Sequence, residues 1–122
     1  MAAPRVLVIE DNEDMRAMLV FVLRLSGFEV SGVPDGRGAL AALVSTPTDA
    51  IVTDLFMPDQ DGIETIVQVR RAFPHVKIIA MSGWQSAQGP DYLEVAREIG
   101  AVHTLRKPFD PEELVSILRS VL

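Results

Sequence analysis

Short apolar runs alternate with longer mixed segments along the whole chain. Three of these runs are rich in β-branched residues, at 5–9, 50–53 and 76–81, and two weaker ones lie at 28–33 and 102–105. Each run has the length and composition of a β-strand. Because the strongest runs are apolar almost without interruption, they predict strands that are buried on both faces of a sheet.

The segments between the runs are long enough for helices, and several carry helix end signals. We expect helices at 13–26, 36–45, 61–73, 90–99 and 110–121. Asp110, Pro111 and Glu113 form the pattern of a capped helix start. Gly27 and Gly100 stand where a helix commonly ends in a residue with positive φ.

The order of these elements predicts an α/β fold. Strand–helix pairs in succession favour a (βα)5 architecture, a doubly wound five-stranded parallel sheet with helices on both faces. The flavodoxin-like strand order 2-1-3-4-5 makes the first and third strands neighbours. We expect residues 1–122 to form a single domain with no output domain attached. An apolar face of the first helix is expected in the core: Met15, Met18, Leu19, Val22 and Leu23.

The charge balance and the absence of cysteine exclude several function classes. The 122 residues carry 17 acidic and 11 basic side chains, a net charge of −6, with no basic patch that favours nucleic acid or a membrane surface. The longest apolar run, from Ala17 to Leu23, is far shorter than the roughly 20 residues that span a bilayer. The lack of cysteine excludes disulfides and thiolate chemistry, and we expect a cytoplasmic protein.

Polar side chains follow most of the predicted strands at the same end. Glu10 and Asp11 follow the first strand and Asp54 follows the third. Ser82 follows the fourth strand and Lys107 the fifth. Ligands of open parallel sheets bind beyond the carboxyl ends of the strands, where the strand order reverses. We therefore expect the three carboxylates to converge at this edge of the sheet.

This set of side chains favours phosphoryl transfer. Three carboxylates at close range repel one another unless they share a proton or bind a cation. Oxygen ligands without His or Cys favour Mg²⁺ (or Mn²⁺), which leaves coordination positions open for a phosphorylated ligand. Lys107 adds a positive charge and Ser82 a hydroxyl that can reach a phosphoryl oxygen. Asp54 is the nucleophile that we expect to accept the phosphoryl group.

The chain resembles the receiver domains of two-component response regulators, of the type represented by the chemotaxis regulator. The resemblance rests on the acidic pair Glu10-Asp11, on the segment from Asp54 to Gly62, on Ser82 before a small residue, and on Lys107 before proline. It covers essentially the whole chain. The motifs are weak singly, but their order at the ends of successive strands is highly specific.

The resemblance implies a role for each acidic residue. Asp54 is the phosphoacceptor, which takes a phosphoryl group from a sensor histidine kinase or a phosphotransfer protein. Asp11 is the direct metal ligand and Glu10 acts through water. The backbone carbonyl of Phe56 completes the metal ligands that the protein supplies. Such a domain promotes only its own phosphorylation and dephosphorylation and is not an enzyme in the ordinary sense.

The resemblance also implies a conformational switch. Ser82 and Lys107 bind the phosphoryl oxygens, and the peptide bond from Lys107 to Pro108 is expected to be cis. In the family the hydroxyl moves towards the phosphate while an aromatic residue of the fifth strand turns inward. Here Thr104 occupies the position of that aromatic residue. We hypothesise that Trp84 or its loop supplies the readout instead.

The bulky residues Phe56 and Trp84 stand at two positions near the phosphate that often tune hydrolysis, and they predict a slow loss of phosphate. Output partners are expected on the face formed by the fourth helix, the fifth strand and the fifth helix. The apolar residues of that face are mostly needed by the core. They favour a monomer or a weak dimer.

Two other function classes remain as alternatives. A receiver-like module that binds a partner regardless of phosphate is favoured by Thr104. A Mg²⁺-dependent phosphatase or nuclease is disfavoured because Phe56 stands where those sites need a second acid. A nucleotide or flavin site is disfavoured because the acidic stretch 10–14 would repel a phosphate.

Overall fold

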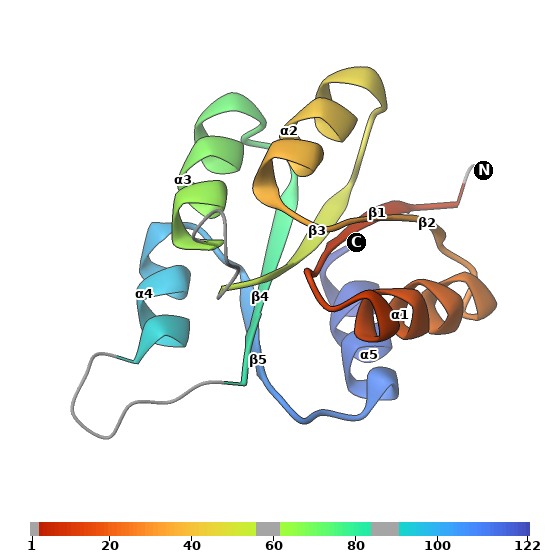
Figure 1. Ribbon diagram of the computed structural model, residues 1–122. Coiled ribbons are helices and arrows are strands. Elements are labelled where there is room, and N and C mark those ends of the chain that lie inside the picture. Colours follow the sequence, from red (N-terminus) through yellow and green to blue (C-terminus); the bar gives the residue numbers. More distant parts are fainter. Residues whose placement is uncertain (1–2, 56–61, 84–90) are drawn as a thin grey trace.

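The computed structural model describes residues 3–55, 62–83 and 91–122, and strands alternate with helices throughout these ranges (Figure 1). The elements are β1 (Arg5–Ile9), α1 (Glu13–Leu25), β2 (Glu29–Val33), α2 (Gly36–Ser45), β3 (Ala50–Asp54), α3 (Gly62–Ala72), β4 (Lys77–Ser82), α4 (Tyr92–Ile99), β5 (His103–Arg106) and α5 (Pro111–Val121). The predicted alternation of strands and helices is confirmed.

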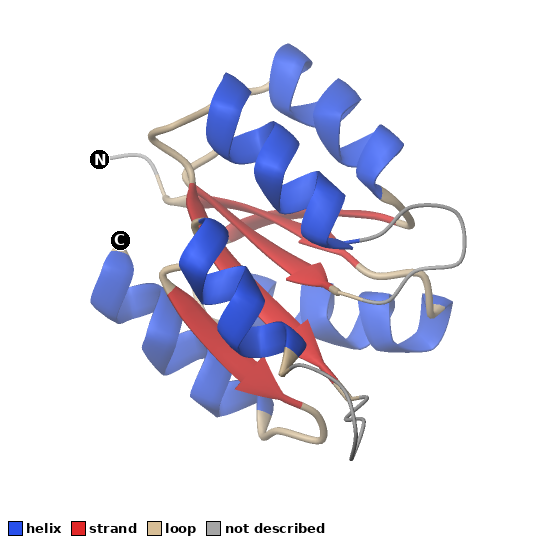
Figure 2. Cartoon of the chain, turned by 90° about the vertical axis from the view of Figure 1, so that its left-hand side faces the viewer, coloured by secondary structure: helices blue, strands red, loops and turns tan. Residues whose placement is uncertain are grey.

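The strands form one parallel sheet in the order β2-β1-β3-β4-β5, as expected. In Figure 2 the strand arrowheads all point towards the same edge of the molecule, and the C-terminus lies at the opposite edge. Ile9 pairs with Thr53, and Asp54 pairs with Met81. This register brings the carboxyl ends of β1, β3 and β4 to one level, because paired residues lie side by side across the sheet.

Helices cover both faces of the sheet. One core cluster packs α1 and α5 against one face, through buried residues such as Leu19 and Leu114. The second cluster packs α2, α3 and α4 against the other face, through residues such as Ile66. The central strands β1, β3 and β4 are buried along nearly their whole length, whereas the edge strands β2 and β5 are partly exposed. Burial on both faces explains the continuous apolar sequence of the central strands.

The ends of the helices follow local side-chain chemistry. Asn12 caps α1, where its Oδ1 accepts a hydrogen bond from the N–H of Met15 at 2.8 Å. Asp110 caps α5 directly before Pro111, as the sequence predicts. Gly27 and Gly100 have the expected positive φ, 98° and 139°. Asn12 and Asp110 thus fix where α1 and α5 start relative to the preceding strands.

Three expectations need correction. Met18 was expected in the core, but its side chain is 41% exposed because it lies on the outer face of α1. The segment predicted as a helix from 90 starts at Tyr92, because Asp91 caps it through the N–H of Leu93. The third and fourth strands each extend one residue further, so Asp54 and Ser82 are the last residues of β3 and β4 rather than loop residues.

Candidate functional site

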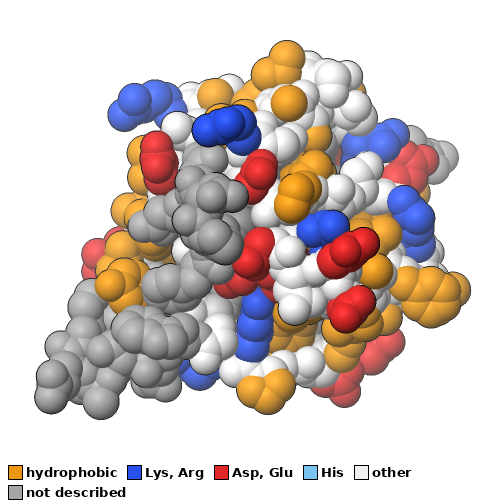
Figure 3. All heavy atoms as spheres, viewed as in Figure 1, with side chains coloured by type: hydrophobic (Ala, Val, Ile, Leu, Met, Phe, Trp, Pro, Cys, Tyr) orange, Lys and Arg blue, Asp and Glu red, His pale blue; other side chains and the backbone are white. Residues whose placement is uncertain are grey.

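The three predicted carboxylates lie together at the carboxyl edge of the sheet. Glu10, Asp11 and Asp54 each offer an oxygen within 4.8 Å of the others. Glu10 is 1% exposed and Asp54 6%, whereas Asp11 is exposed. In Figure 3, acidic side chains gather near the middle of the face that Figure 1 shows, with basic ones close by. The pairing of β1 with β3 produces this cluster, as the strand order predicts.

Lys107 is the cation of the cluster. Its Nζ lies 2.6 Å from Oε1 of Glu10 and 3.2 Å from Oδ2 of Asp54. Burial disfavours the charged form of Lys107, but the hydrogen bond with Glu10 and the charge of Asp54 outweigh it and raise its pKa above the ordinary value. The ammonium group therefore stays charged and joins the ends of β1 and β3 to the segment after β5. The Lys107–Pro108 peptide bond is cis, as expected.

Glu10 is held on several sides. Besides the contact with Lys107, its Oε2 lies 3.4 Å from the N–H of Asn12. Its backbone N–H donates to the carbonyl of Val33 on β2 at 3.1 Å, and its own carbonyl accepts from Nη1 of Arg16 at 2.8 Å. Asp11 is the outermost member of the cluster, and its exposed carboxylate is the one most accessible to a ligand from solution.

Ser82 completes the set of predicted polar residues at this edge. It is the last residue of β4, 1% exposed, and it directly follows Met81, which pairs with Asp54. Its carbonyl accepts a hydrogen bond from the N–H of Lys107 at 2.9 Å. A Cβ on the next residue, Gly83, would lie 3.2 Å from Cβ of Lys107, so glycine allows the lysine side chain to pack closely here.

The donor set suits a hard divalent cation. All three carboxylates offer oxygen, and the cluster includes no His or Cys, which is the ligand preference of Mg²⁺. The three carboxylates have a single lysine close by, which contacts two of them, so the cluster keeps an excess of negative charge. An acidic triad of this kind is consistent with the Mg²⁺ site that the resemblance to receiver domains implies. Phe56, whose carbonyl was expected among the ligands, lies outside the described residues.

The surroundings of the Asp11 carboxylate lead to a prediction about stability. Partial burial is the largest cause that raises the pKa of Asp11. The hydrogen bond with Glu10 and the negative charge of Glu10 raise this pKa further. A raised pKa means that the native state binds the proton more tightly than the unfolded chain. Ionisation of Asp11 therefore lowers stability as the pH rises through about 3.9, and the loss is complete above the native pKa.

Asp11→Asn is consequently expected to raise the melting temperature of the metal-free domain at pH 7 by about 2–4 °C. The gain should shrink at high salt and vanish at acid pH, as thermal melts followed by circular dichroism will show. Asp14→Asn is the matched control. Asp14 is in the first turn of α1, where a carboxylate favours the helix, so its loss should lower stability slightly. A lower melting temperature for Asp11→Asn would contradict the prediction.

Thr104 stands where the resemblance leads us to expect an aromatic residue, and it makes a polar contact. Its Oγ1 accepts a hydrogen bond from Nη2 of Arg97 on α4 at 2.9 Å. The neighbouring Arg106 pairs with Asp91 at 3.2 Å. These residues line a groove of about 310 Å³ between α4 and β5. Trp84, the proposed alternative readout, lies outside the described residues. The readout through Trp84 and the slow loss of phosphate therefore stay predictions.

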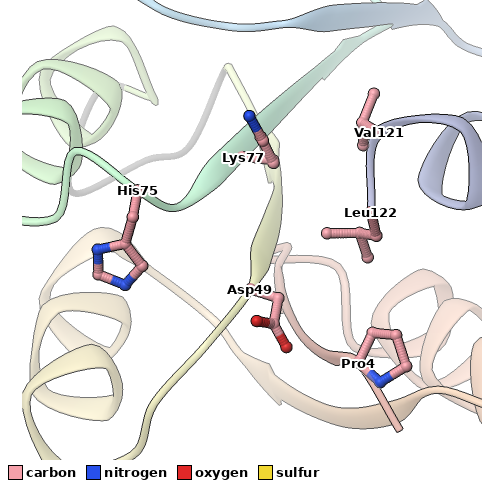
Figure 4. A pocket seen from close by; sticks show the side chains of 6 residues that line it. All are labelled: Pro4, Asp49, His75, Lys77, Val121 and Leu122. Atoms are coloured by element: carbon pink, nitrogen blue, oxygen red, sulfur yellow. The ribbon is translucent and has the colours of Figure 1, made fainter.

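A second hollow lies at the opposite edge of the sheet. It encloses about 380 Å³. Figure 4 shows its lining side chains, which come from the starts of β1, β3 and β4 and from the end of α5: Pro4, Asp49, His75, Lys77, Val121 and Leu122. Among the described residues, the only group of three or more candidate metal ligands is the one at the carboxyl edge. The chemistry is therefore assigned to that edge.

The sequence interpretation missed two residues that shape the site. Asn12 caps α1 and donates its N–H towards Glu10. Arg16 reaches back from α1 to the carbonyl of Glu10. Side chains of a helix point towards its N-terminus, so an arginine one turn after the cap could have been recognised as a residue that reaches the preceding loop.

Comparison with known proteins decides the family. The model of the response regulator receiver domain matches residues 6–119. The chain belongs to this family. The transcriptional regulatory protein PrrA of Mycobacterium leprae is 40% identical over 121 residues, which are 99% of this chain and 51% of PrrA. The chemotaxis protein CheY of Thermotoga maritima is 33% identical over 119 residues, 96% of each chain.

A solved structure gives the same result for the receiver domain. Chemotaxis protein CheY4 of Vibrio cholerae superposes with a TM-score of 0.89 at 32% identity, covering 99% of this chain and all of the other. The chain spans about half the length of PrrA and nearly the whole length of the Thermotoga CheY. The expected resemblance is thus confirmed.

The family also settles the class of activity. The chain is a receiver domain of a two-component response regulator, a phosphoacceptor rather than a catalytic enzyme, and receiver domains are phosphorylated by histidine kinases. None of the helices in the described ranges has the length and apolar character needed to cross a membrane.

Proposed function

We propose that Asp54 accepts the phosphoryl group, that Asp11, Glu10 and Asp54 hold Mg²⁺ or Mn²⁺, and that Lys107 and Ser82 bind the phosphoryl oxygens. The observation that carries the proposal is the convergence of three carboxylates at the carboxyl edge of the sheet, two of which contact Lys107. A nucleophile, a cation site and a compensating charge are then within reach of one phosphoryl group. A histidine kinase or a phosphotransfer protein is the proposed donor, and the cytoplasmic location stays a prediction.

The transfer requires no general base. A carboxylate oxygen of Asp54 forms a bond to phosphorus while the phosphorus–nitrogen bond of the donor breaks, and that bond's electron pair stays on the donor nitrogen. A bound divalent cation supplies charge neutralisation for the phosphoryl oxygens. Lys107 is already placed 3.2 Å from Asp54, so it can follow the charge as it moves from the carboxylate to the phosphoryl group. The product is a mixed anhydride on Asp54.

Intact-protein mass spectrometry tests this function without a kinase. The protein is incubated with phosphoramidate, a small donor with a phosphorus–nitrogen bond, in the presence of Mg²⁺. We expect one phosphoryl group per chain, lost on mild treatment with base or hydroxylamine as an acyl phosphate is. Chelation of the metal should abolish the adduct, and Mn²⁺ should restore it. An adduct that forms equally well in excess chelator would refute the metal-dependent mechanism.

The hydrogen bond between Arg97 and Thr104 favours a second candidate function. A polar contact holds α4 on β5 where the family uses an aromatic residue, so this face could bind an output partner without a phosphate-driven change. The absence of any adduct in the phosphoramidate experiment would favour this phosphorylation-independent module. In either case the face of α4, β5 and α5 is the proposed output surface. The proposed state of the chain alone is a monomer or a weak dimer.

A further inference from the structure

Arg16 lies beside the acidic cluster without belonging to it. It is in the first turns of α1, half-buried, and its Nη1 donates a hydrogen bond to the carbonyl oxygen of Glu10 at 2.8 Å. That carbonyl belongs to the peptide bond that joins Glu10 to Asp11. The guanidinium group thus contacts the backbone between two of the three carboxylates rather than any of the carboxylates themselves.

Gly32 provides the path for the arginine side chain. Gly32 pairs with Val8 in the neighbouring strand, near the end of β2. A Cβ at this glycine would lie 3.0 Å from Cγ of Arg16, 3.2 Å from its Cδ and 3.1 Å from Cγ2 of Val20, closer than most real contacts of a Cβ atom. The stem of Arg16 therefore crosses β2 over a residue that has no side chain, and this crossing lets the guanidinium reach the end of β1.

The backbone of Glu10 is held from both sides. Its N–H donates to the carbonyl of Val33 at 3.1 Å, and its carbonyl accepts from Arg16. The plane of the following peptide bond is then fixed, and with it the direction in which Asp11 leaves the backbone. Asp11 is exposed, so besides its hydrogen bond with Glu10 little of the surrounding packing holds its carboxylate in place.

We infer that Arg16 is a positioning residue for the divalent cation and that Gly32 is what permits it to act. Arg16 fixes the peptide between Glu10 and Asp11, and thereby keeps the Asp11 carboxylate turned towards Asp54. The planar guanidinium suits this task because it donates in a fixed direction. The inference rests on the proposed metal-dependent function and adds a residue outside the expected ligand set.

The direction of the change in metal affinity separates positioning from simple electrostatics. Arg16→Ala removes a positive charge from the neighbourhood of a cation site, and Coulomb's law alone then predicts tighter binding of Mg²⁺. Loss of positioning predicts weaker binding. We expect the dissociation constant of Mg²⁺, measured by titration calorimetry on the folded protein, to rise about tenfold, as for other groups that orient metal ligands.

The phosphorylation rate gives an independent readout. With phosphoramidate as donor, Arg16→Ala should need about tenfold more Mg²⁺ for half of its maximal rate, while the maximal rate stays within about twofold of wild type. Arg16→Lys, which keeps the charge but not the geometry, should bind Mg²⁺ more weakly than wild type as well. A lower maximal rate at unchanged metal affinity would instead indicate a structural role and overturn the inference.

Arg24 offers a matched control on the same helix. Its Nη2 donates to the carbonyl of Val30 on β2 at 2.9 Å, which is the same kind of bond from α1. Val30 pairs with Val6 of β1, four residues before Glu10, so this bond lies away from the cluster. Arg24→Ala should leave the affinity for Mg²⁺ unchanged. A shift equal to that of Arg16→Ala would overturn the inference, because it would show a general effect of loosening α1.

Gly32→Ala tests the path with Arg16 still present. The added methyl group presses on the arginine stem, so Mg²⁺ binding should weaken in the same direction. In the double variant with Arg16→Ala the methyl group still meets Cγ2 of Val20, but it should have no further effect on the affinity for Mg²⁺, and this non-additivity reports the coupling. If a folded Arg16→Ala protein binds Mg²⁺ with the affinity of the wild type, the inference about Arg16 is overturned but the proposed function is not. If the wild-type protein neither binds Mg²⁺ nor accepts a phosphoryl group, the proposed function itself is overturned.

Discussion

The Asp54→Asn protein is expected to stay unmodified under conditions in which the wild type gains one phosphoryl group. An amide nitrogen and oxygen lack the charge and nucleophilicity of a carboxylate, so no bond to phosphorus forms. The fold should persist, because the amide oxygen can still accept the hydrogen bond that Lys107 donates at 3.2 Å. Phosphoramidate, Mg²⁺ and intact mass give the measurement, with loss of at least about a hundredfold in rate expected for removal of a nucleophile.

Asp49→Asn is the control for this experiment. Asp49 precedes β3, at the opposite end of the same strand, and its Oδ2 accepts from the N–H of Arg5 at 2.8 Å. It should be phosphorylated like the wild type. If Asp54→Asn still acquired a base-labile phosphoryl group at a comparable rate, the acceptor would have to be another residue, and the assignment of Asp54 would be wrong.

The position of Asp54 was predictable because the topology of a parallel sheet determines where the end of each strand lies. Apolar runs located β1 and β3, and the strand order of doubly wound sheets placed their carboxyl ends together. A residue that directly follows such a run can only lie at that edge. The meeting of Glu10, Asp11 and Asp54 therefore follows from sequence position alone, without knowledge of any side-chain conformation.

Contacts that depend on side-chain reach were not predictable in the same way. Arg16 lies one helical turn from the cluster in sequence, but its role depends on Gly32, which belongs to another strand. Met18 matched the helical spacing of the apolar face, yet a helix has only a limited arc that faces the sheet, and Met18 falls outside it. Periodicity identifies a face, but the packing of neighbours decides how wide the buried part of that face is.

The contact of Thr104 is a third feature that the sequence did not predict. The sequence showed that an aromatic residue is missing three positions before Lys107, but it did not show what takes its place. Arg97 supplies a hydrogen bond to Thr104 from α4. The packing of α4 on β5 determines this pair. The sequence alone does not show which partner a long polar side chain contacts, because the position of the helix is not known.

Replacement of Lys107 by Met should have the largest effect on stability. The lysine side chain is 20% exposed, and among the described residues it is the only cationic group within 4 Å of the carboxylate oxygens of Glu10 and Asp54. Its raised pKa means that the native state holds the proton more tightly than the unfolded chain. The stabilisation is thus fully present below the ordinary pKa of about 10.4 and is lost as the pH rises through the native value.

At pH 7, Lys107→Met leaves two buried carboxylates without their counter-charge. Removal of one partner from a buried ion pair lowers stability by about 3–5 kcal/mol, because the remaining charge is neither hydrated nor paired. We expect a loss at the low end of that range, since Lys107 retains some contact with solvent. Urea denaturation at pH 7 followed by circular dichroism measures it. Lys77→Met, at the exposed start of β4, should change stability by less than about 0.5 kcal/mol.

One further response distinguishes lost charge compensation from lost packing. Mg²⁺ should stabilise the variant more than the wild type, because the cation then takes over the role of the ammonium group. A stability deficit that stays the same with and without Mg²⁺ would assign the effect of Lys107 to packing of its aliphatic stem instead.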